Sequence, residues 1–292
     1  INSLNETVEP ALIDQFQGSG GINQTFFSVG FPLFKFLNLG GTLNYNFGNL
    51  EYQTEQFKQG VDFATQLNRK SSVSGWSYQV AANVTMPIGA KHEMKAMYTY
   101  QPMANFDSSN EQIIFTRSIS NNTIIDFEEI DLSANGLQNT TMKFPLSQKF
   151  GIGFGKPKKW FLGVQRNMSS YSTFKNSFVL RENITYEDAS QFTVGGFFIP
   201  NYTSLTSYFS RAVYRFGFRK EELGVLVNNI PLTETGISFG IGLPMSGYSN
   251  ANVGIEMGRR GEKNNGLVRE TYFALRVGLS LNALWFIKPK YN

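Results

Sequence analysis

The sequence predicts an all-β protein, an antiparallel transmembrane β-barrel of about 12–14 strands with short periplasmic turns and long extracellular loops. From Tyr272 to Leu281, apolar residues alternate with polar or small ones without a break, which indicates a strand with one apolar and one polar face. A strand of about ten residues crosses a bilayer when it is tilted. The same alternation recurs through most of the chain. Aromatic residues form 15% of the sequence, with 27 Phe and 13 Tyr, which suits the lipid-facing positions and interfacial belts of a barrel.

Composition excludes several other classes of protein. The 292 residues suffice for one large all-β domain, and the absence of cysteine excludes disulfide and thiolate-metal chemistry. A net charge of +4 is too small to indicate nucleic-acid binding. No apolar run approaches the length of about 18 residues that a membrane-spanning helix needs. The chain opens with Ile1-Asn2-Ser3-Leu4 and not with a signal peptide, so we expect a mature or truncated form.

Eleven segments carry the strand pattern. Each combines period-2 alternation with β-branched or aromatic residues. In order they are Ile22–Phe31, Leu39–Phe47, Trp76–Met86, His92–Met103, Phe144–Phe154, Trp160–Met168, Phe192–Ile199, Ala212–Phe218, Ile237–Leu243, Val253–Gly258 and Tyr272–Leu281.

The connections between these segments alternate strictly between short and long. The short ones each contain a Pro or Gly turn former, and we expect them in the periplasm. They are Pro32–Leu37, Pro87–Lys91, Gly155–Lys159, Pro200–Tyr208 and Pro244–Asn250. The long ones are expected as extracellular loops at 48–72, 104–140, 169–189, 219–236 and 259–268. Within the second long loop, 112–118 and 123–130 are expected to form an extra hairpin.

Strand parity yields a further expectation about the start of the chain. If the last strand ends in the periplasm, counting back through eleven strands makes the first one start outside. Bacterial barrels have even strand numbers, so at least one strand is expected upstream. Residues 1–21 do not alternate, and we expect them to be a non-strand segment before a barrel at 22–292. A natural N-terminal portion is therefore expected to be missing.

Four stretches then suggest a family. They are Gly18–Gln24, Gly151–Phe154, Ser238–Pro244 and the C-terminal Gly258–Lys288, of which the last is the most distinctive. Residues 18–292 resemble a family of outer-membrane barrels from Bacteroidota-type bacteria, related to the long-chain fatty-acid transporter (FadL-like) superfamily. The resemblance implies about 14 strands and an N-terminal hatch inside the barrel. It also implies a bacterial outer-membrane location, because family members act as transporters or are proposed as accessory subunits of outer-membrane machines, including the β-barrel assembly machine.

A polar cluster near the last three strands is the first candidate site. It contains Glu256, Arg259, Arg260, Glu270 and Arg276. Glu256 and Arg276 share the polar face of adjacent strands, so both are expected to point into the lumen. Lumenal charges pair because an isolated desolvated charge is costly. The cluster is interpreted either as a gate that contacts an internal plug or, preferentially, as a structural ion-pair ladder.

A basic stripe is the second candidate. Arg211, Arg215 and Arg219 share parity with Gly217 and oppose the aromatic positions of the same segment. The pattern predicts a positive inner wall. Such a wall would attract an acid headgroup or the carboxylates of a plug, although simple solvation of the lumen is the favoured explanation.

Catalytic, metal and cofactor sites are not predicted. His92 is the sole histidine, and it lies at a turn between Lys91 and Glu93. The glycine repeats are not followed by a helix and are interpreted as strands with small inward residues. Interfacial aromatic positions are expected instead. These are Trp76, Trp160, Trp285 and Tyr291.

Two functions remain open for such a barrel. The first is a non-enzymatic conduit for hydrophobic small molecules. The alternative is an accessory or scaffold subunit of a multiprotein outer-membrane machine, such as the β-barrel assembly machine or a secretion system, since loops this long usually serve partner contact. The expected partners are outer-membrane lipids or lipopolysaccharide, other outer-membrane barrels and lipoproteins, and no nucleic acid.

Overall fold

The computed structural model describes residues 12–178, 183–245, 249–263 and 267–280, and within them it is all-β. These residues form 15 strands and two short 3-10 helices. The strands are β1 (Leu12–Phe34), β2 (Leu37–Lys58), β3 (Phe63–Ile88), β4 (His92–Gln101), β5 (Ala104–Ser118), β6 (Ile124–Glu129), β7 (Asn139–Phe144), β8 (Ser147–Lys156), β9 (Trp160–Ser169), β10 (Ile184–Tyr186), β11 (Ala189–Phe198), β12 (Val213–Val227), β13 (Ile230–Pro244), β14 (Asn250–Arg260) and β15 (Glu270–Ser280). The helices are η1 (Tyr171–Thr173) and η2 (Phe209–Arg211).

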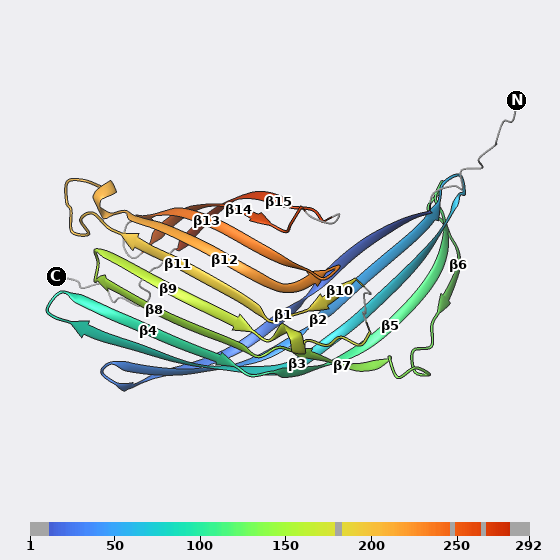
Figure 1. The fold of residues 1–292 in the computed structure, drawn as a ribbon, viewed down its shortest axis with the longest axis horizontal. Helices are drawn as coiled ribbons and strands as arrows, with labels where there is room; N and C mark the ends of the chain where they lie inside the picture. Colours follow the sequence, from blue (N-terminus) through green and yellow to red (C-terminus); the bar gives the residue numbers. More distant parts are fainter. Residues whose placement is uncertain (1–11, 179–182, 246–248, 264–266, 281–292) are drawn as a thin grey trace, which may run out of the picture.

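All the strands belong to one antiparallel sheet whose main path is a meander. Its order is β1-β2-β3-β4-β8-β9-β11-β12-β13-β14-β15, which confirms the eleven segments expected from alternation. The sheet curls, so that β13–β15 lie across from β1–β4 (Figure 1). None of the described helices combines the length and the apolar character that crossing a bilayer requires.

The two faces of the curled sheet differ in chemistry. Along β8, Gly151, Gly153 and Gly155 are buried, whereas Ile152 and Phe154 between them are exposed. Residues on the inside of a curled sheet crowd one another, so the glycine and polar side is the concave face. The convex face exposes large apolar side chains on strand after strand. On β8–β15 these include Phe150, Ile152, Leu162, Val164, Phe192, Phe216, Phe218, Ile237, Phe239, Val253, Met257, Phe273, Leu275, Val277 and Leu279.

The first strands extend far beyond the others at the end where the long connections lie. We call this projection the wing. It consists of residues 12–22 of β1, 48–58 of β2, 63–74 of β3 and 107–118 of β5, together with β6 (Figure 1). The wing begins where β3 changes its neighbour, because its residues 80–88 pair with β4 and its residues 63–74 pair with β5.

A small apolar core lies at the root of the wing. Val73 of β3, Phe106 of β5 and Met142 of β7 are almost fully buried against one another. Gly75 makes this packing possible, because a Cβ atom there would lie 2.4 Å from the Phe106 ring. Leu50 of β2 packs against the same cluster, so the branch is held by apolar contacts as well as by the main chain.

Several segments that were expected as loops are strands. The expected loops 48–72 and 219–236 are hairpins that continue β2 into β3 and β12 into β13, and 104–140 contains β5, β6 and β7. Residues 12–21, expected as non-strand, form the start of β1. These segments lack a regular apolar alternation, and continuous main-chain pairing together with polar side-chain contacts extends the strands through them. Residues 1–11 lie outside the described part of the chain.

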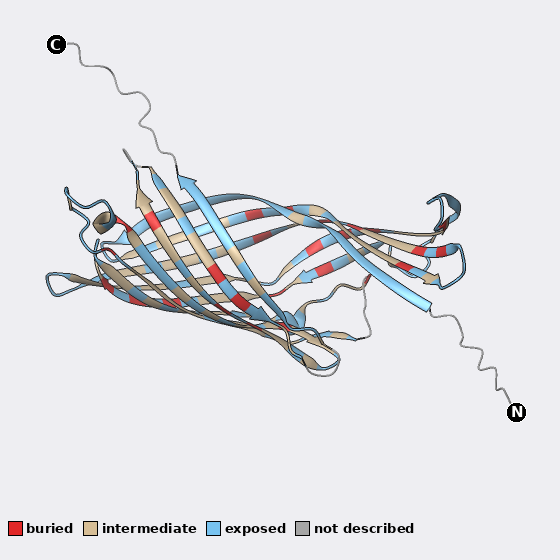
Figure 2. Ribbon diagram, turned by 90° about the horizontal axis from the view of Figure 1, so that it is seen from above, coloured by how far each residue is buried: buried red, intermediate tan, exposed pale blue. Residues whose placement is uncertain are grey.

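Both edges of the main sheet are open within the described residues. β1 pairs only with β2 and β15 pairs only with β14, so the described strands do not close into a barrel. Figure 2 shows both edge strands exposed along nearly their whole length. Because the antiparallel path contains an odd number of strands, β1 and β15 run in the same direction.

Candidate functional site

A cluster of charged side chains joins the last four strands of the sheet on their concave face. Its members come from β12 (Arg219, Glu221), β13 (Glu234), β14 (Glu256, Arg260) and β15 (Tyr272, Arg276), and we call them the charged cluster. It holds three arginines and three glutamates, so its formal charges cancel. Tyr272 is its one uncharged member.

Glu234 is the most deeply buried member of the charged cluster. Its side chain is only 2% exposed. Arg219 Nη2 donates to its Oε1 at 2.5 Å, and the Tyr272 hydroxyl donates to the same oxygen at 2.8 Å. Arg260 Nε donates to the other oxygen at 2.5 Å. A buried carboxylate held by two arginines and a hydroxyl is stabilised in its charged form, because each donor compensates part of its lost hydration.

Glu256 repeats this arrangement one strand further on. Arg219 Nη2 reaches its Oε1 at 2.9 Å, and Arg276 Nη1 donates to its Oε2. Arg219 therefore bridges the two buried carboxylates, and its Nη1 also pairs with Glu221 at 2.8 Å. This single guanidinium contacts side chains of β12, β13, β14 and β15. The cluster thus crosslinks four strands through side chains and leaves none of its charges free for a ligand.

Two glycines clear the space that the charged cluster occupies. Arg219, Gly236, Gly258 and Tyr272 face one another in register across four strands. Adjacent strands lie about 4.8 Å apart, so Arg219 must reach over two strands to meet the Tyr272 hydroxyl at 3.0 Å. A Cβ atom on Gly258 would lie 2.4 Å from the tyrosine ring. The missing side chains therefore permit the contact.

The sequence pattern predicted part of this cluster. The fold brings Glu256, Arg260 and Arg276 together, and Glu270 faces Arg260 in register. Arg259 is a correction, because it alternates with Gly258 and Arg260 and so lies on the convex face beside Met257. Sequence reasoning missed three members. These are Glu221, Glu234 and Tyr272, of which the first two fell in an expected loop.

The expected basic stripe is shorter than predicted. Arg219 belongs to the charged cluster, while Arg215 is exposed on the same face and donates from Nη1 to Asn252 Oδ1 at 2.9 Å. Arg211 is a correction, because β12 starts only at Val213 and Arg211 lies in η2. Its guanidinium lies 5.5 Å from the centre of the Tyr208 ring. Arg211 therefore lies outside the strand, and the alternation of faces along β12 does not apply to it.

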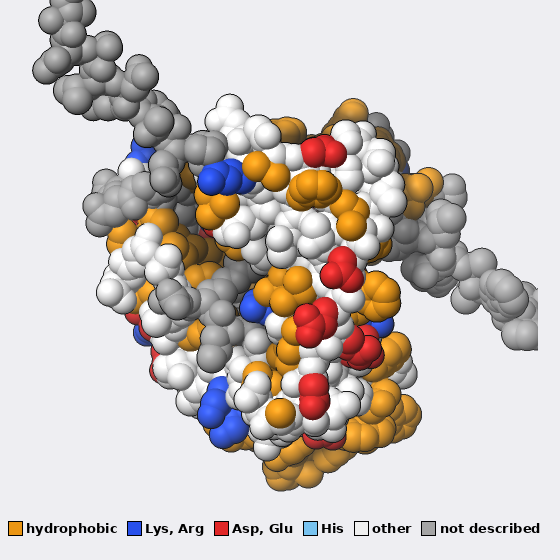
Figure 3. Space-filling model, turned by 90° about the vertical axis from the view of Figure 1, so that its right-hand side faces the viewer, with side chains coloured by type: hydrophobic (Ala, Val, Ile, Leu, Met, Phe, Trp, Pro, Cys, Tyr) orange, Lys and Arg blue, Asp and Glu red, His pale blue; other side chains and the backbone are white. Residues whose placement is uncertain are grey.

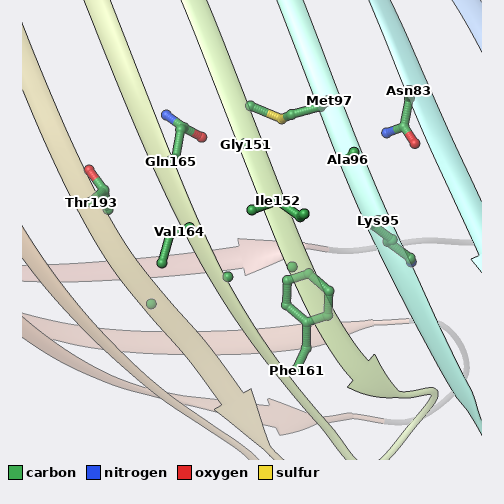
Figure 4. A pocket seen from close by; sticks show the side chains of 13 residues that line it. Asn83, Lys95, Ala96, Met97, Gly151, Ile152, Phe161, Val164, Gln165 and Thr193 are labelled. Atoms are coloured by element: carbon green, nitrogen blue, oxygen red, sulfur yellow. The ribbon is translucent and has the colours of Figure 1, made fainter.

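A second concave-face feature is a hollow of about 310 Å³ over β3, β4, β8, β9 and β11. Its floor is a row of glycines in register, Gly153, Gly163 and Gly195. The side chain of Met97 on β4 lies over Gly151 of β8, and the Phe161 ring lies over Gly153 (Figure 4). Small inward residues thus leave room in the concave face.

The remaining sequence predictions fall at the margins of the sheet. Trp76 is 60% exposed on the convex face and its ring centre lies 5.0 Å from that of Tyr45. Trp160 starts β9 near His92, with ring centres 6.1 Å apart. Trp285 and Tyr291 lie outside the described residues. In the part of the chain that the structure describes, no three His, Asp or Glu side chains form a group that could hold a metal ion.

Asp62 fastens the tip of the wing. It lies in the turn between β2 and β3 and accepts hydrogen bonds from the hydroxyls of Ser120, at 2.8 Å, and Ser118, at 2.9 Å. The Ser120 main-chain N–H adds a third bond. The Ser120 and Ser118 hydroxyls hold the pKa of the Asp62 carboxyl below its ordinary value of 3.8. The two hairpin tips of the wing are therefore joined by one ionised side chain.

Comparison with known proteins gives one family and a set of solved folds. The sequence model of the family described as BamG matches residues 1–292. No curated protein matches the chain.

Among solved structures, the Ralstonia pickettii toluene transporter TbuX is 11% identical, with a TM-score of 0.53 over 83% of this chain and 64% of that chain. The CymD monoaromatic hydrocarbon channel is 12% identical, with a TM-score of 0.50 over 85% of this chain and 72% of its own. The RagAB peptide importer in the closed-closed state is 11% identical with a TM-score of 0.48, and this chain spans 30% of its matched chain. At these identities the likeness concerns the fold alone.

Proposed function

The chain belongs to the BamG family, and from this premise we propose that it is an accessory subunit of the β-barrel assembly machine in a bacterial outer membrane. The observation that carries the proposal is the family match over residues 1–292. It favours the accessory subunit over the conduit, because the distant likeness to hydrocarbon channels concerns the fold and not what passes through it.

We propose that the curled sheet is the wall of a transmembrane barrel. Its convex face exposes apolar side chains on every strand from β8 to β15, which is costly in water and favourable in lipid. Its concave face is polar, as a barrel lumen is. Trp160 at the short-turn end and Trp76 toward the wing suit the two membrane interfaces.

Closure of such a barrel has a defined requirement. Because β1 and β15 run in the same direction, antiparallel closure needs an odd number of further strands between them. An open edge within lipid would leave main-chain N–H and C=O groups without partners, and each of these costs several kcal/mol, ~2–7 by transfer measurements. We propose that strands outside the described residues close this seam, whether from this chain or from another subunit.

We interpret the charged cluster as a structural crosslink between strands and not as a gate. Its charges balance, and its central guanidinium already bridges Glu221, Glu234 and Glu256. A gate for an anionic plug would need free cations on the concave face. Of the expected stripe, Arg211 lies outside the strand and Arg215 has no ion pair among the described residues, and one exposed arginine on the concave face is weak support for a gate.

The wing is the part of the molecule best suited to contact other subunits. It projects beyond the apolar belt, and Figure 3 looks onto its end, where Asp and Glu side chains gather among apolar ones. β6 is an edge strand that pairs only with β5, and all of its residues are exposed. Phe127 in this strand is 71% exposed. An exposed edge with apolar side chains is a surface on which a partner strand pairs readily.

Affinity purification of the tagged full chain in a mild detergent tests the proposal. We expect the other subunits of the assembly machine to copurify in fixed stoichiometry, identified by mass spectrometry. F127S is expected to weaken this association, because the ring has no packing role in the isolated chain. L205S is the matched control, since Leu205 is 99% exposed between β11 and β12 at the short-turn end.

The outcomes separate two claims. A single barrel that carries only lipid or a hydrophobic small molecule would reject the accessory role and restore the conduit. If the wild-type chain brings its partners and F127S brings them equally well, only the contact through β6 is wrong.

A further inference from the structure

A row of basic and hydroxyl side chains, interrupted by Phe192, crosses the convex face of the sheet. In the register of the strands, Phe192 of β11 lies between Arg166 of β9 and Lys220 of β12. The row continues through Thr235 of β13, Arg259 of β14 and Thr271 of β15. Strand spacing sets Arg166, Lys220 and Arg259 on alternate strands, about 10 Å apart. We call these six residues the outer row.

On β12, β14 and β15 the outer row marks the level at which the apolar run of the convex face ends. On β12, Tyr214, Phe216 and Phe218 point outward before Lys220. On β14, Val253 and Met257 precede Arg259 in the same way. The final strand runs in the opposite sense, and its apolar outward run from Leu279 up to Phe273 stops at Thr271.

A membrane interface explains this change. A cation that faces lipid at the bilayer midplane costs about 2–4 kcal/mol, and the cost falls to about 0–1 kcal/mol near the headgroups. The cations of the outer row therefore face lipid at a low cost in free energy only at headgroup level. It lies toward the wing and the long connections, so the headgroups at that level are those of the outer leaflet.

The cations of the outer row have no ion pairs among the described residues, unlike the three arginines of the charged cluster. Among the described residues, Arg219, Arg260 and Arg276 all form ion pairs with glutamates, whereas Arg166 and Arg259 form none. Lys220 has no ion pair in the same part of the chain. All three outward cations are exposed. A protein that lined up unpaired cations beside an apolar belt would attract anionic headgroups above embedded acyl chains.

Two hollows lie along the outer row, and each contains cations. The first, of about 320 Å³, is lined by Arg166, Ser190, Phe192, Lys220 and Glu222. Its carboxylate is engaged, because Ser190 Oγ donates to it at 2.9 Å. The hollow therefore holds two cations against one carboxylate, a net formal charge of +1.

The second hollow measures about 600 Å³ and lies over β13, β14 and β15. Arg259 and Arg269 line it together with the apolar side chain of Met257. Its one carboxylate, Glu262, accepts a hydrogen bond from Thr233 Oγ1 at 3.3 Å. Each hollow thus combines two cations, one engaged carboxylate and an adjacent apolar wall.

We infer that the outer row binds the phosphate groups of a phosphorylated glycolipid of the outer leaflet, of the lipid A class, with its acyl chains along the apolar face below. Arginine and lysine supply the charge-assisted donors, and the hydroxyls of Thr235 and Thr271 add neutral ones. The inference rests on the proposed placement in the outer membrane. It adds the lipid class and the residues that hold it.

Native mass spectrometry of the full chain in dodecylmaltoside micelles, titrated with bisphosphorylated lipid A, tests this inference. The R166Q/K220Q/R259Q variant is expected to bind about a hundredfold more weakly, since each cation near an anionic surface is worth about fivefold in affinity. The control changes three exposed turn lysines at the opposite end of the sheet, K35Q/K91Q/K159Q. It removes the same charge and is expected to bind lipid A like the wild type.

Four results would overturn the inference. These are equal loss in both variants, no loss in either, unchanged binding of dephosphorylated lipid A, or displacement of the lipid by millimolar inorganic phosphate, which would indicate a phosphate-ion site. Resistance of the variants to urea extraction from membranes is measured in parallel. If the wild-type chain itself is extracted, the proposed membrane placement fails. If it is retained and the variant binds lipid A normally, only the lipid site fails.

Discussion

Replacement of Arg219 by methionine is the sharpest test of the charged cluster. The variant removes the cation that Glu221, Glu234 and Glu256 share, which leaves two arginines against three glutamates. Removal of one partner from a buried ion pair costs about 3–5 kcal/mol. Because Arg219 is 29% exposed and both buried carboxylates retain another arginine, we expect the lower end after screening, about 2–3 kcal/mol.

The assay is equilibrium unfolding in urea of the chain refolded into lipid vesicles, followed by tryptophan fluorescence. R215M is the matched control, because Arg215 lies on the same face of the same strand and has one exposed hydrogen bond to Asn252. It should cost under about 1 kcal/mol. The double variant R219M/E256Q should recover part of the loss, since it restores charge balance. Equal stability of R219M and R215M would refute the argument that Arg219 compensates buried charge.

Three further predictions concern other parts of the structure. G258A should destabilise by about 1–3 kcal/mol, because the new methyl group would lie 2.4 Å from the Tyr272 ring, whereas G254A, with its nearest atom at 3.7 Å, should be close to neutral in the same urea assay. The pKa of Asp62 is lowered, so its contribution to the wing tip is present above about pH 4 and is lost as pH falls through the lowered value. Limited proteolysis of the wild-type wing tip should therefore accelerate below that pH, while D62N should be cleaved faster at neutral pH as well. S77A removes the hydroxyl that accepts from two buried asparagine amides and should cost about 1–3 kcal/mol by urea unfolding.

Alternation located the strands well because a sheet with one apolar and one polar face imposes a strict period of two. It failed in the wing. Residues 12–21 and 48–58 form regular strands without that pattern, because continuous main-chain pairing and polar side-chain contacts such as that of Gln56 with Asp14 fix the conformation there. The expected hairpin at 112–118 and 123–130 was found because its ends carry apolar residues and a turn.

The errors at the candidate site have a similar origin. Arg259 was grouped with Glu256 by closeness in sequence, although a shift of one residue moves a side chain to the opposite face of a strand. Glu234 was missed because its strand was expected to begin only at Ile237, whereas β13 begins at Ile230. The role of Gly236 and Gly258 depends on register across four strands, which a single sequence does not reveal. The sequence did contain one signal: Gly236 and Gly258 lie an even number of residues from Glu234 and Glu256, and so on the same face of their strands.

The charged cluster and the outer row occupy the same level of the sheet, back to back. The concave row runs Arg219, Gly236, Gly258 and Tyr272, and the convex row runs Lys220, Thr235, Arg259 and Thr271. Each pair consists of consecutive residues on one strand, so they point to opposite faces. Charged side chains therefore lie on both faces of the sheet at one level. Those of the charged cluster form ion pairs on the concave face, and those of the outer row form none among the described residues. The inward carboxylates Glu234 and Glu256 are buried and need cationic partners, whereas the outward cations have no ion pair among the described residues. The proposed placement in the membrane therefore sets both rows at the edge of the bilayer core, with the wing beyond it.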